Sequence, residues 1–285
     1  MKIIILGANG QLGLELTNIL KNKYNLKAYR KEELDITDFQ LVNKIIFDEK
    51  PKILINTAAY TSVEDAEKNI DYAYKVNSEA VHNISKSLEI NNGFLIHYST
   101  DYVYNSLNKK PINEDELIDP QNYYGYSKRE GEKHIENSKV ESIVIRTSWL
   151  YSKYGNNFVN AIIDKSKTGE NLKVINDQFG CPTYAKDLAL AVIQILESDK
   201  RIDEKTKIFN YSNGGSTNWF NFAKKILFLY GSDKIIEPVD SEYFKDQVKR
   251  PKFSITSKQK IIDTFNLEIN NWDKSLADFI SNDLK

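Results

Sequence analysis

Residues 3–13 read Ile3-Ile4-Ile5-Leu6-Gly7-Ala8-Asn9-Gly10-Gln11-Leu12-Gly13. The apolar run predicts a strand that is covered on both faces, and the amphipathic segment that starts at Gln11 predicts a helix. The glycines between them form a G-x-x-G-x-x-G loop, which permits a tight turn and lets the backbone approach a diphosphate. Free N–H groups at the start of the helix favour negative charge there. The stretch predicts a dinucleotide-binding βα unit, although an ordinary glycine-rich βα turn would have the same pattern.

Short apolar runs alternate with longer amphipathic segments through the first two thirds of the chain. The runs cover residues 3–6, 26–29, 53–55, 94–97 and 143–145, and the segments cover residues 11–20, 39–47, 72–88 and 124–135. This alternation predicts an α/β fold, with a doubly wound parallel sheet of the Rossmann type. A further run at 173–175, followed by a helix at 186–196, is expected to return to the same sheet.

The pattern changes after residue 200 to more scattered helices, which predicts a smaller C-terminal substrate-binding lobe. The expected boundaries give 1–147 and about 170–200 to an NAD(P)-binding domain, and about 148–169 and 201–285 to the lobe. Trp219, Phe220 and Phe222 have the spacing of a helix face, so we expect them in the core of the lobe.

The composition of the 285 residues excludes several classes of protein. Lys and Arg number 39 and Asp and Glu number 40, so a uniformly positive surface for nucleic acid or an anionic membrane is excluded. The single cysteine, Cys181, permits neither an intrachain disulfide nor a thiolate zinc site, and the histidines lack metal-ligand spacing. No apolar run is long enough for a membrane span or a signal peptide. We expect a cytoplasmic protein without a metal site, a nucleic-acid partner or a membrane partner.

The second predicted strand ends in Tyr29-Arg30-Lys31, where an acidic residue would bind the ribose 2′-hydroxyl of NADH. Arg30 and Lys31 are better suited to a 2′-phosphate, so the pair favours NADPH. NADH stays open, because basic pairs at strand ends are also common on solvated surfaces. Asp35 and Ile36 follow shortly afterwards and are expected beside the adenine.

Two Tyr-x-x-x-Lys pairs occur in the chain, Tyr124/Lys128 and Tyr230/Lys234, so the spacing alone indicates nothing. Context favours the first pair, which begins a long predicted helix behind a strand that ends at Thr100. An adjacent ammonium favours phenolate, so we predict that Lys128 lowers the pKa of Tyr124. Tyr124 would then protonate a substrate carbonyl oxygen that Thr100 hydrogen-bonds. In the alternative, Thr100 is only a strand-end hydroxyl and Tyr124 a packing aromatic.

These motifs resemble the extended short-chain dehydrogenase/reductases and, within them, the dTDP-4-dehydrorhamnose reductase family. The similarity covers most of the chain and is carried by residues 7–13, 56–61, 97–104, 124–128, 146–149, 156–158, 176–180 and 250–251. The chain departs from the family at Glu64, where Asp is common, and at Cys181, where Ala or Ser is usual.

The resemblance implies that NAD(P)H reduces the 4-keto group of a dTDP-sugar substrate, dTDP-4-dehydro-L-rhamnose, to give dTDP-L-rhamnose. It implies a catalytic set of Thr100, Tyr124 and Lys128. The cofactor contacts, to which the sequence adds Arg30, would be Gly7, Gly10, Gln11, Leu12, Asp35, Ile36, Ala58, Ala59, Thr61, Tyr124 and Lys128. The substrate contacts would be Thr100, Asp101, Tyr102, Tyr124, Trp149 and Arg250. A role for Mg²⁺ and the oligomeric state stay open, with a homodimer as one alternative.

Sugar dehydratases of the same fold carry a Glu after the Thr-Asp pair, whereas this chain has Tyr102. Elimination of water would lack its base, which favours carbonyl reduction. Two alternatives remain. The first is another nucleotide-sugar reductase or epimerase, and the second is a non-catalytic NADP-binding regulatory subunit like that of methionine adenosyltransferase. The presence of Thr100, Tyr124 and Lys128 together argues against the regulatory subunit.

Overall fold

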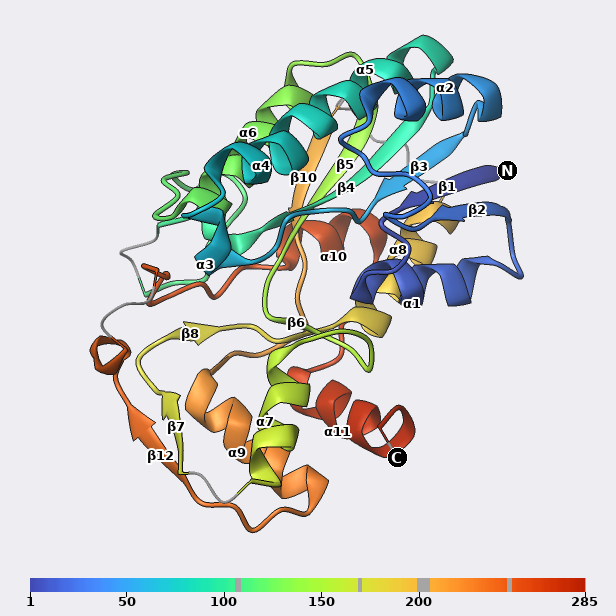
Figure 1. Ribbon diagram of the computed structural model, residues 1–285. Helices are drawn as coiled ribbons and strands as arrows, with labels where there is room; N and C mark the ends of the chain where they lie inside the picture. Colours follow the sequence, from blue (N-terminus) through green and yellow to red (C-terminus); the bar gives the residue numbers. More distant parts are fainter. Residues whose placement is uncertain (106–108, 169–170, 199–205, 245–247, 285) are drawn as a thin grey trace.

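The computed structural model describes residues 1–105, 109–168, 171–198, 206–244 and 248–284. A six-stranded sheet has the order β10-β5-β4-β3-β1-β2, and its neighbouring strands are parallel (Figure 1). Its strands are β1 (Lys2–Leu6), β2 (Asn25–Tyr29), β3 (Ile53–Asn56), β4 (Phe94–Thr100), β5 (Glu141–Thr147) and β10 (Thr206–Asn210). Strand order reverses at β1, which lies between β2 and β3, and ligands bind at such reversals. The predicted doubly wound α/β fold is confirmed.

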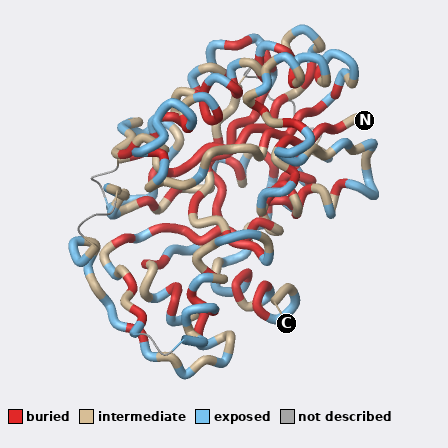
Figure 2. Tube along the Cα trace, in the orientation of Figure 1, coloured by how far each residue is buried: buried red, intermediate tan, exposed pale blue. Residues whose placement is uncertain are grey.

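Helices cover both faces of this sheet, because successive side chains of β1 point to opposite faces. Ile3 and Ile5 belong to the core under α1 (Gln11–Leu20), α8 (Ala185–Glu197) and α10 (Gln259–Phe265). Ile4 and Leu6 belong to the core under α2 (Phe39–Glu49), α5 (Ala80–Asn91) and α6 (Tyr123–Glu136). Figure 2 shows the buried residues concentrated along the sheet between these helix layers. The helix predicted at 72–88 is divided into α4 (Ile70–Tyr74), a π-helix, η1 (Lys75–Glu79), and α5.

A second, smaller lobe has its own hydrophobic core, which includes Tyr151, Phe222 and Phe279. Its helices are α7 (Phe158–Ser166), α9 (Trp219–Tyr230) and α11 (Trp272–Asn282). Its paired strands are β6 (Leu150–Tyr151) with β9 (Thr183–Tyr184), β7 (Leu172–Ile175) with β12 (Ile236–Val239), and β8 (Phe179–Gly180) with β11 (Thr217–Asn218). The short helices α3 (Val63–Ala66), η2 (Asp101–Val103) and η3 (Ser241–Tyr243) complete the described elements.

Two strands lie elsewhere than the sequence indicated. The expected return of residues 173–175 to the main sheet is wrong, because β7 pairs with β12 in the smaller lobe. Its alternating burial is that of a sheet with one covered face. Conversely, β10 falls within the range expected for the lobe but is the edge strand of the six-stranded sheet, where polar residues are tolerated. The expected boundaries at 169–170 and 200–201 lie outside the described residues.

A buried ion pair fixes α6 on the sheet. Arg146 of β5 donates from Nε and Nη2 to the two carboxylate oxygens of Glu132 on α6, at 2.8 and 2.7 Å. Both side chains are 0% exposed. Arg146 also donates to the Tyr104 hydroxyl at 2.6 Å. The bidentate geometry and the added hydrogen bond offset the free-energy cost of taking both charges out of water. If one partner were removed, the other charge would stay buried without this compensation.

Glu132→Ala is expected to lower the free energy of unfolding by about 3–5 kcal/mol, because Arg146 would keep a buried charge without its carboxylate. Glu136→Ala is the matched control, since Glu136 lies at the exposed end of the same helix and pairs with Arg129. It is expected to cost less than about 1 kcal/mol. Urea unfolding measures both values, and equal losses would contradict the anchoring role.

Candidate active site

The glycine loop holds the start of α1 against the carboxyl ends of β1 and β3. Gly7 has a φ of +76°, and a Cβ there would lie 2.6 Å from the backbone nitrogen of Ala58. A Cβ at Gly13 would lie 2.3 Å from the carbonyl oxygen of Gly7. A Cβ at Gly10 would meet nothing nearer than 3.4 Å among the described atoms, so this position can accept a ligand. The first turn of α1 has no acidic side chain and no side-chain cap, which leaves its N–H groups for an anion.

A cavity of about 180 Å³ opens beside this loop, and we call it the loop cavity. It is lined by the predicted cofactor residues Gly7, Gly10, Asp35, Ile36, Ala58 and Ala59. Lys31 also lines it, with Nζ donating to the Tyr72 hydroxyl at 3.0 Å. Arg30 is exposed and is not one of the lining residues. The Leu12 side chain packs in the core, so only its backbone is placed to meet a ligand of this cavity.

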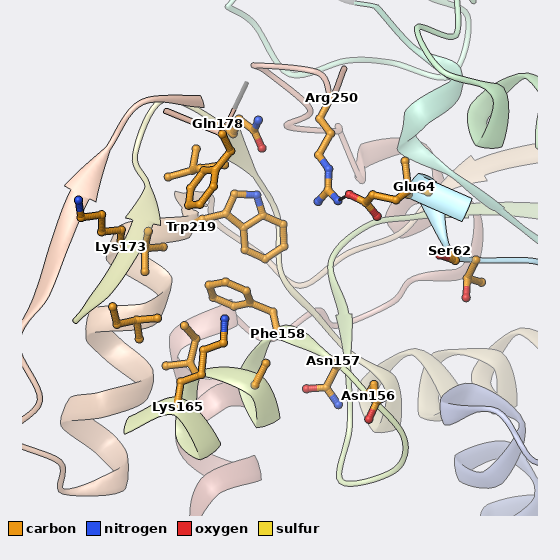
Figure 3. A pocket seen from close by; sticks show the side chains of 18 residues that line it. Ser62, Glu64, Asn156, Asn157, Phe158, Lys165, Lys173, Gln178, Trp219 and Arg250 are labelled. Atoms are coloured by element: carbon orange, nitrogen blue, oxygen red, sulfur yellow. Dashed lines mark hydrogen bonds and ion pairs between the residues drawn. The ribbon is translucent and has the colours of Figure 1, made fainter. Parts of the chain in front are cut away.

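A second cavity, of about 650 Å³, lies between the lobes, and we call it the interlobe cavity. Thr61 and Glu64 line its sheet side, and the loop and helix at Asn156 to Lys165, strand β7 and Trp219 line its lobe side. In Figure 3, Lys165 and Lys173 lie across the cavity from Glu64. Cations and aromatic rings therefore share one cavity, which suits a ligand with anionic and flat parts.

Arg250 closes one side of the interlobe cavity. Its Nη2 forms an ion pair with Glu64, and its Nε is buried without a hydrogen-bond partner among the described residues. Burial acts to lower the pKa of Arg250, but the neighbouring Tyr102 and Glu64 raise it. The guanidinium therefore stays charged and has one N–H free for a further acceptor.

The resemblance indicated Trp149 as a substrate contact, but the tryptophan that lines the interlobe cavity is Trp219. The Trp149 ring stacks on Trp219 with centroids 3.4 Å apart, and Trp149 has a φ of 45°. A Cβ at Gly180 would lie 2.6 Å from the Trp149 ring. The sequence indicated only a core position for Trp219, because the same helix spacing buries Phe222. A local pattern therefore gave no signal that one ring of this helix faces a cavity.

The predicted catalytic residues come from two elements that approach closely. Thr100 ends β4, and Tyr124 and Lys128 lie on α6. Asn122 caps α6 by accepting the Gly125 N–H at 2.8 Å. A Cβ at Gly125 would lie 2.3 Å from the carbonyl oxygen of Tyr102, so glycine is what lets the first turn of α6 approach this segment.

The residues beside Tyr124 form a compact polar group. The Tyr102 and Tyr124 rings meet edge to face at 5.9 Å. Thr100 Oγ1 donates to Asp101 Oδ1 at 3.2 Å, and Asp101 Oδ2 is buried without a hydrogen-bond partner among the described residues. Tyr102 adjoins Arg250, which connects this group to the interlobe cavity.

Burial dominates the ionisation of Tyr124 and Lys128, two of the predicted catalytic residues. It raises the pKa of Tyr124 to about 12, even though a hydrogen bond with Thr100 lowers it. Burial also lowers the pKa of Lys128 to about 8. Lys128 Nζ donates to the Tyr98 carbonyl at 2.6 Å. The expected lowering of the Tyr124 pKa is therefore not what the structure shows, because desolvation outweighs the favourable contacts of the phenol.

The part of the chain that the structure describes meets the requirements of neither a metal site nor a membrane-spanning helix. No three side chains of His, Cys, Asp or Glu come together there in an arrangement that could hold a metal ion. Cys181 is buried and free. No helix within the described ranges combines the length and apolar character that a membrane crossing requires.

The chain matches one protein family over nearly its whole length. The family model described as RmlD substrate binding domain matches residues 1–284. The spore coat polysaccharide biosynthesis protein SpsK of Bacillus subtilis is 36% identical, over 98% of this chain and 96% of its own length. The dTDP-4-dehydrorhamnose reductase of Aggregatibacter actinomycetemcomitans is 35% identical, over 96% of this chain and 97% of its own.

Solved structures agree with this assignment. The dTDP-4-dehydrorhamnose reductase of Bacillus anthracis, crystallised in complex with NADP, has a TM-score of 0.92 and 35% identity, and the match covers 99% of each chain. The UDP-glucose 4-epimerase of Thermotoga maritima has a TM-score of 0.83 at 19% identity, which supports a shared fold alone. This chain therefore belongs to the dTDP-4-dehydrorhamnose reductase family, which the RmlD substrate binding domain describes.

Proposed function

We propose that this protein uses NADPH to reduce the 4-keto group of dTDP-4-dehydro-L-rhamnose, which yields dTDP-L-rhamnose. The observation that carries the proposal is the close approach of Thr100, at the end of β4, to Tyr124 on α6 at the carboxyl edge of the sheet. The same edge carries the glycine loop, and Tyr102 and Arg250 connect the pair to the interlobe cavity. Family membership supports the same reaction.

The loop cavity fits a dinucleotide. Gly10 and the uncapped start of α1 would receive the diphosphate, and Asp35 and Ile36 would lie beside the adenine. Arg30 and Lys31 are both exposed, but only Lys31 lines the cavity, so Lys31 would contact a 2′-phosphate. The Bacillus anthracis relative was crystallised with NADP, which supports NADPH as the preferred coenzyme. When bound, the coenzyme supplies the hydride that the carbonyl carbon receives.

Tyr124 would supply the proton that completes the reduction. The carbonyl carbon gains a hydride and the carbonyl oxygen gains the Tyr124 Oη proton, so the ketone becomes a hydroxyl. The high pKa of the buried phenol keeps that proton in place until negative charge develops on the carbonyl oxygen. Thr100 would hold the same oxygen, and the charged form of Lys128 would stabilise the phenolate that remains.

Asp101 would bind the sugar as a carboxylic acid. Burial raises its pKa to about 7, so much of it carries a proton near neutrality. A neutral carboxyl can donate a hydrogen bond to a sugar oxygen, which a carboxylate cannot do. Thr100 and Ser254 are the described side chains that act on this carboxyl, and its buried Oδ2 atom would make the contact with the sugar.

The interlobe cavity would hold the nucleotide part of the substrate, and the smaller lobe would thus be the sugar-nucleotide domain. Lys165, Lys173 and Arg250 supply positive charge for a diphosphate. The Phe158 and Trp219 rings, whose centroids lie 4.5 Å apart, supply apolar surface for a base or a sugar. The ion pair of Arg250 with Glu64 would give way to the substrate.

The test is NADPH oxidation in the presence of dTDP-4-dehydro-L-rhamnose, with the product identified by NMR. We expect one NADPH consumed for each dTDP-L-rhamnose formed. If only another dTDP-4-keto sugar were turned over, that sugar would be the substrate in place of dTDP-4-dehydro-L-rhamnose. Interconversion of sugars without net NADPH oxidation would identify an epimerase. NADPH binding without turnover of any ketone would favour a regulatory subunit.

Tyr124→Phe is expected to lower kcat by at least about a hundredfold, because it removes the proton donor. Coenzyme affinity should stay within about twofold of the native value. Tyr126→Phe is the matched control, because Tyr126 lies on the same helix and is 42% exposed. Steady-state kinetics measures both variants, and equal activity in the two would rule out Tyr124 as the acid.

Lys31→Ala is expected to weaken NADPH binding by about tenfold and to leave NADH binding nearly unchanged, since it removes a charge-assisted contact to the 2′-phosphate. Arg30→Ala is the neighbouring control and should change neither affinity more than about twofold. Fluorescence titration with each coenzyme measures the effect. A larger loss in Arg30→Ala would assign the phosphate to Arg30 instead.

Asp101→Asn is expected to stabilise the protein increasingly as pH rises. An Asp has a pKa of about 4 in an unfolded chain, and burial raises that of Asp101 to about 7. The stability that this raised pKa confers is fully present below pH 4 and is lost as pH rises through about 7. The Tm difference between variant and native protein should therefore grow over this range in favour of the variant. A difference that does not change with pH would contradict the assignment.

A further inference from the structure

A chain of buried polar side chains leads from β3 to Lys128. Asn56 on β3, His97 on β4 and Lys128 on α6 are 1%, 0% and 2% exposed. Asn56 Nδ2 lies 3.2 Å from His97 Nδ1, and His97 Nε2 lies 3.4 Å from Lys128 Nζ. Asn56 and His97 are not part of the proton transfer described above, so their arrangement needs an explanation of its own.

A backbone group fixes the direction of the hydrogen bonds in this chain. The Ala58 N–H donates to Asn56 Oδ1 at 3.1 Å, so the amide oxygen points toward the backbone. The amide nitrogen must then point toward His97, and Nδ2 donates to Nδ1. With its lone pair on Nδ1 in use, a neutral imidazole carries its proton on Nε2. That N–H points at Lys128.

The imidazole is held in its neutral form. Burial lowers the pKa of His97 well below its ordinary value, and Lys128 lowers it further. An imidazolium would also place its Nδ1–H against the Asn56 amide hydrogens, so the geometry opposes protonation independently.

We propose that Asn56 and His97 act as positioning residues that favour the neutral amine of Lys128 by presenting the Nε2–H group to it. An ammonium has three donors and no acceptor, so it cannot receive this N–H, whereas an amine can. The Tyr98 carbonyl, at 2.6 Å, accepts a hydrogen from either form. The inference rests on the proposed function, in which Lys128 is catalytic.

Only one acidic group opposes this effect among the described residues that influence Lys128. Glu132 faces Lys128 from the same helix and raises its pKa, but burial lowers that pKa to about 8. Glu132 is itself bound by Arg146 from β5 and by Arg129 from α6, so much of its charge is already compensated. Lys128 would therefore change its charge close to neutral pH, and kcat should fall as pH rises through about 8.

The first test observes His97 directly in the full-length protein labelled with ¹⁵N-histidine. The chain has 3 histidines, and the His97 signals are identified by their loss in His97→Gln. We expect a neutral ring with the proton on Nε2 that does not titrate between about pH 6 and 9. A proton on Nδ1, or an imidazolium that titrates in this range, would overturn the proposal.

The second test reverses the direction of the hydrogen bonds that connect residue 56, His97 and Lys128. In Asn56→Asp, the carboxylate accepts hydrogen from both the Ala58 N–H and His97 Nδ1, so Nε2 becomes an acceptor for the Lys128 ammonium. The alkaline limb of the kcat profile should then move up by at least about one pH unit. His97→Gln should move it in the same direction without adding charge, because an amide oxygen can accept from Lys128. If the alkaline limb of the kcat profile stayed at the same pH in both variants, the positioning role of Asn56 and His97 would be refuted.

The two tests separate this inference from the proposed function. The nuclear magnetic resonance result needs no substrate, so an Nε2–H ring in a protein without ketone reduction would refute the function alone. Active enzyme with an Nδ1–H ring would refute the inference alone.

Discussion

The buried pair of Arg146 and Glu132 fixes the position of α6, the helix proposed to carry the catalytic residues, and influences the charge of Lys128. Arg146 binds Glu132 through two hydrogen bonds and thereby fixes α6, with Tyr124 and Lys128, against β5. Glu132 is also the acidic residue that raises the pKa of Lys128. A free carboxylate at this position would hold Lys128 as an ammonium, whereas the guanidinium shares its charge. The position of α6 and the pKa of Lys128 therefore depend on one interaction.

The two lobes are joined by polar contacts at both edges of their cleft. Gln11, at the start of α1, accepts hydrogen bonds from Asn157 at 3.1 Å and Ser152 at 3.2 Å. The ion pair of Arg250 with Glu64 lies on the other side. Gln11 lies within the glycine motif of residues 7–13 and Asn157 lines the interlobe cavity, so the regions proposed for coenzyme and substrate are in direct contact.

Local sequence patterns were sufficient where the physical cause is local. The first strand is buried on both faces, and its glycine loop allows close approaches that a Cβ would block, so both leave a short local motif. The α/β fold followed from residues 3–13 and from the alternation of apolar runs with amphipathic segments. The edge strand β10 has too few buried apolar residues to be recognised, and β7 has the alternation of a half-exposed sheet. Periodicity alone did not reveal which sheet each strand joins.

The site was predictable in its residue types but not in its electrostatics. The spacing of Tyr124 and Lys128 places both on α6. The pKa of each depends on burial, and burial depends on the packing of β4 and on His97, which lie far away in the sequence. Similarly, the sequence could not distinguish Lys31, which lines the loop cavity, from its neighbour Arg30, which does not.

The stacked pair of Trp149 and Trp219 has a spectroscopic consequence. All 3 tryptophans of the chain, these two and Trp272, pack against the core of the smaller lobe. Indole emission therefore originates from that lobe alone, and one of its sources borders the interlobe cavity. The domain that contains the six-stranded sheet has tyrosine fluorescence only. Tryptophan fluorescence therefore reports on the smaller-lobe side of the cleft.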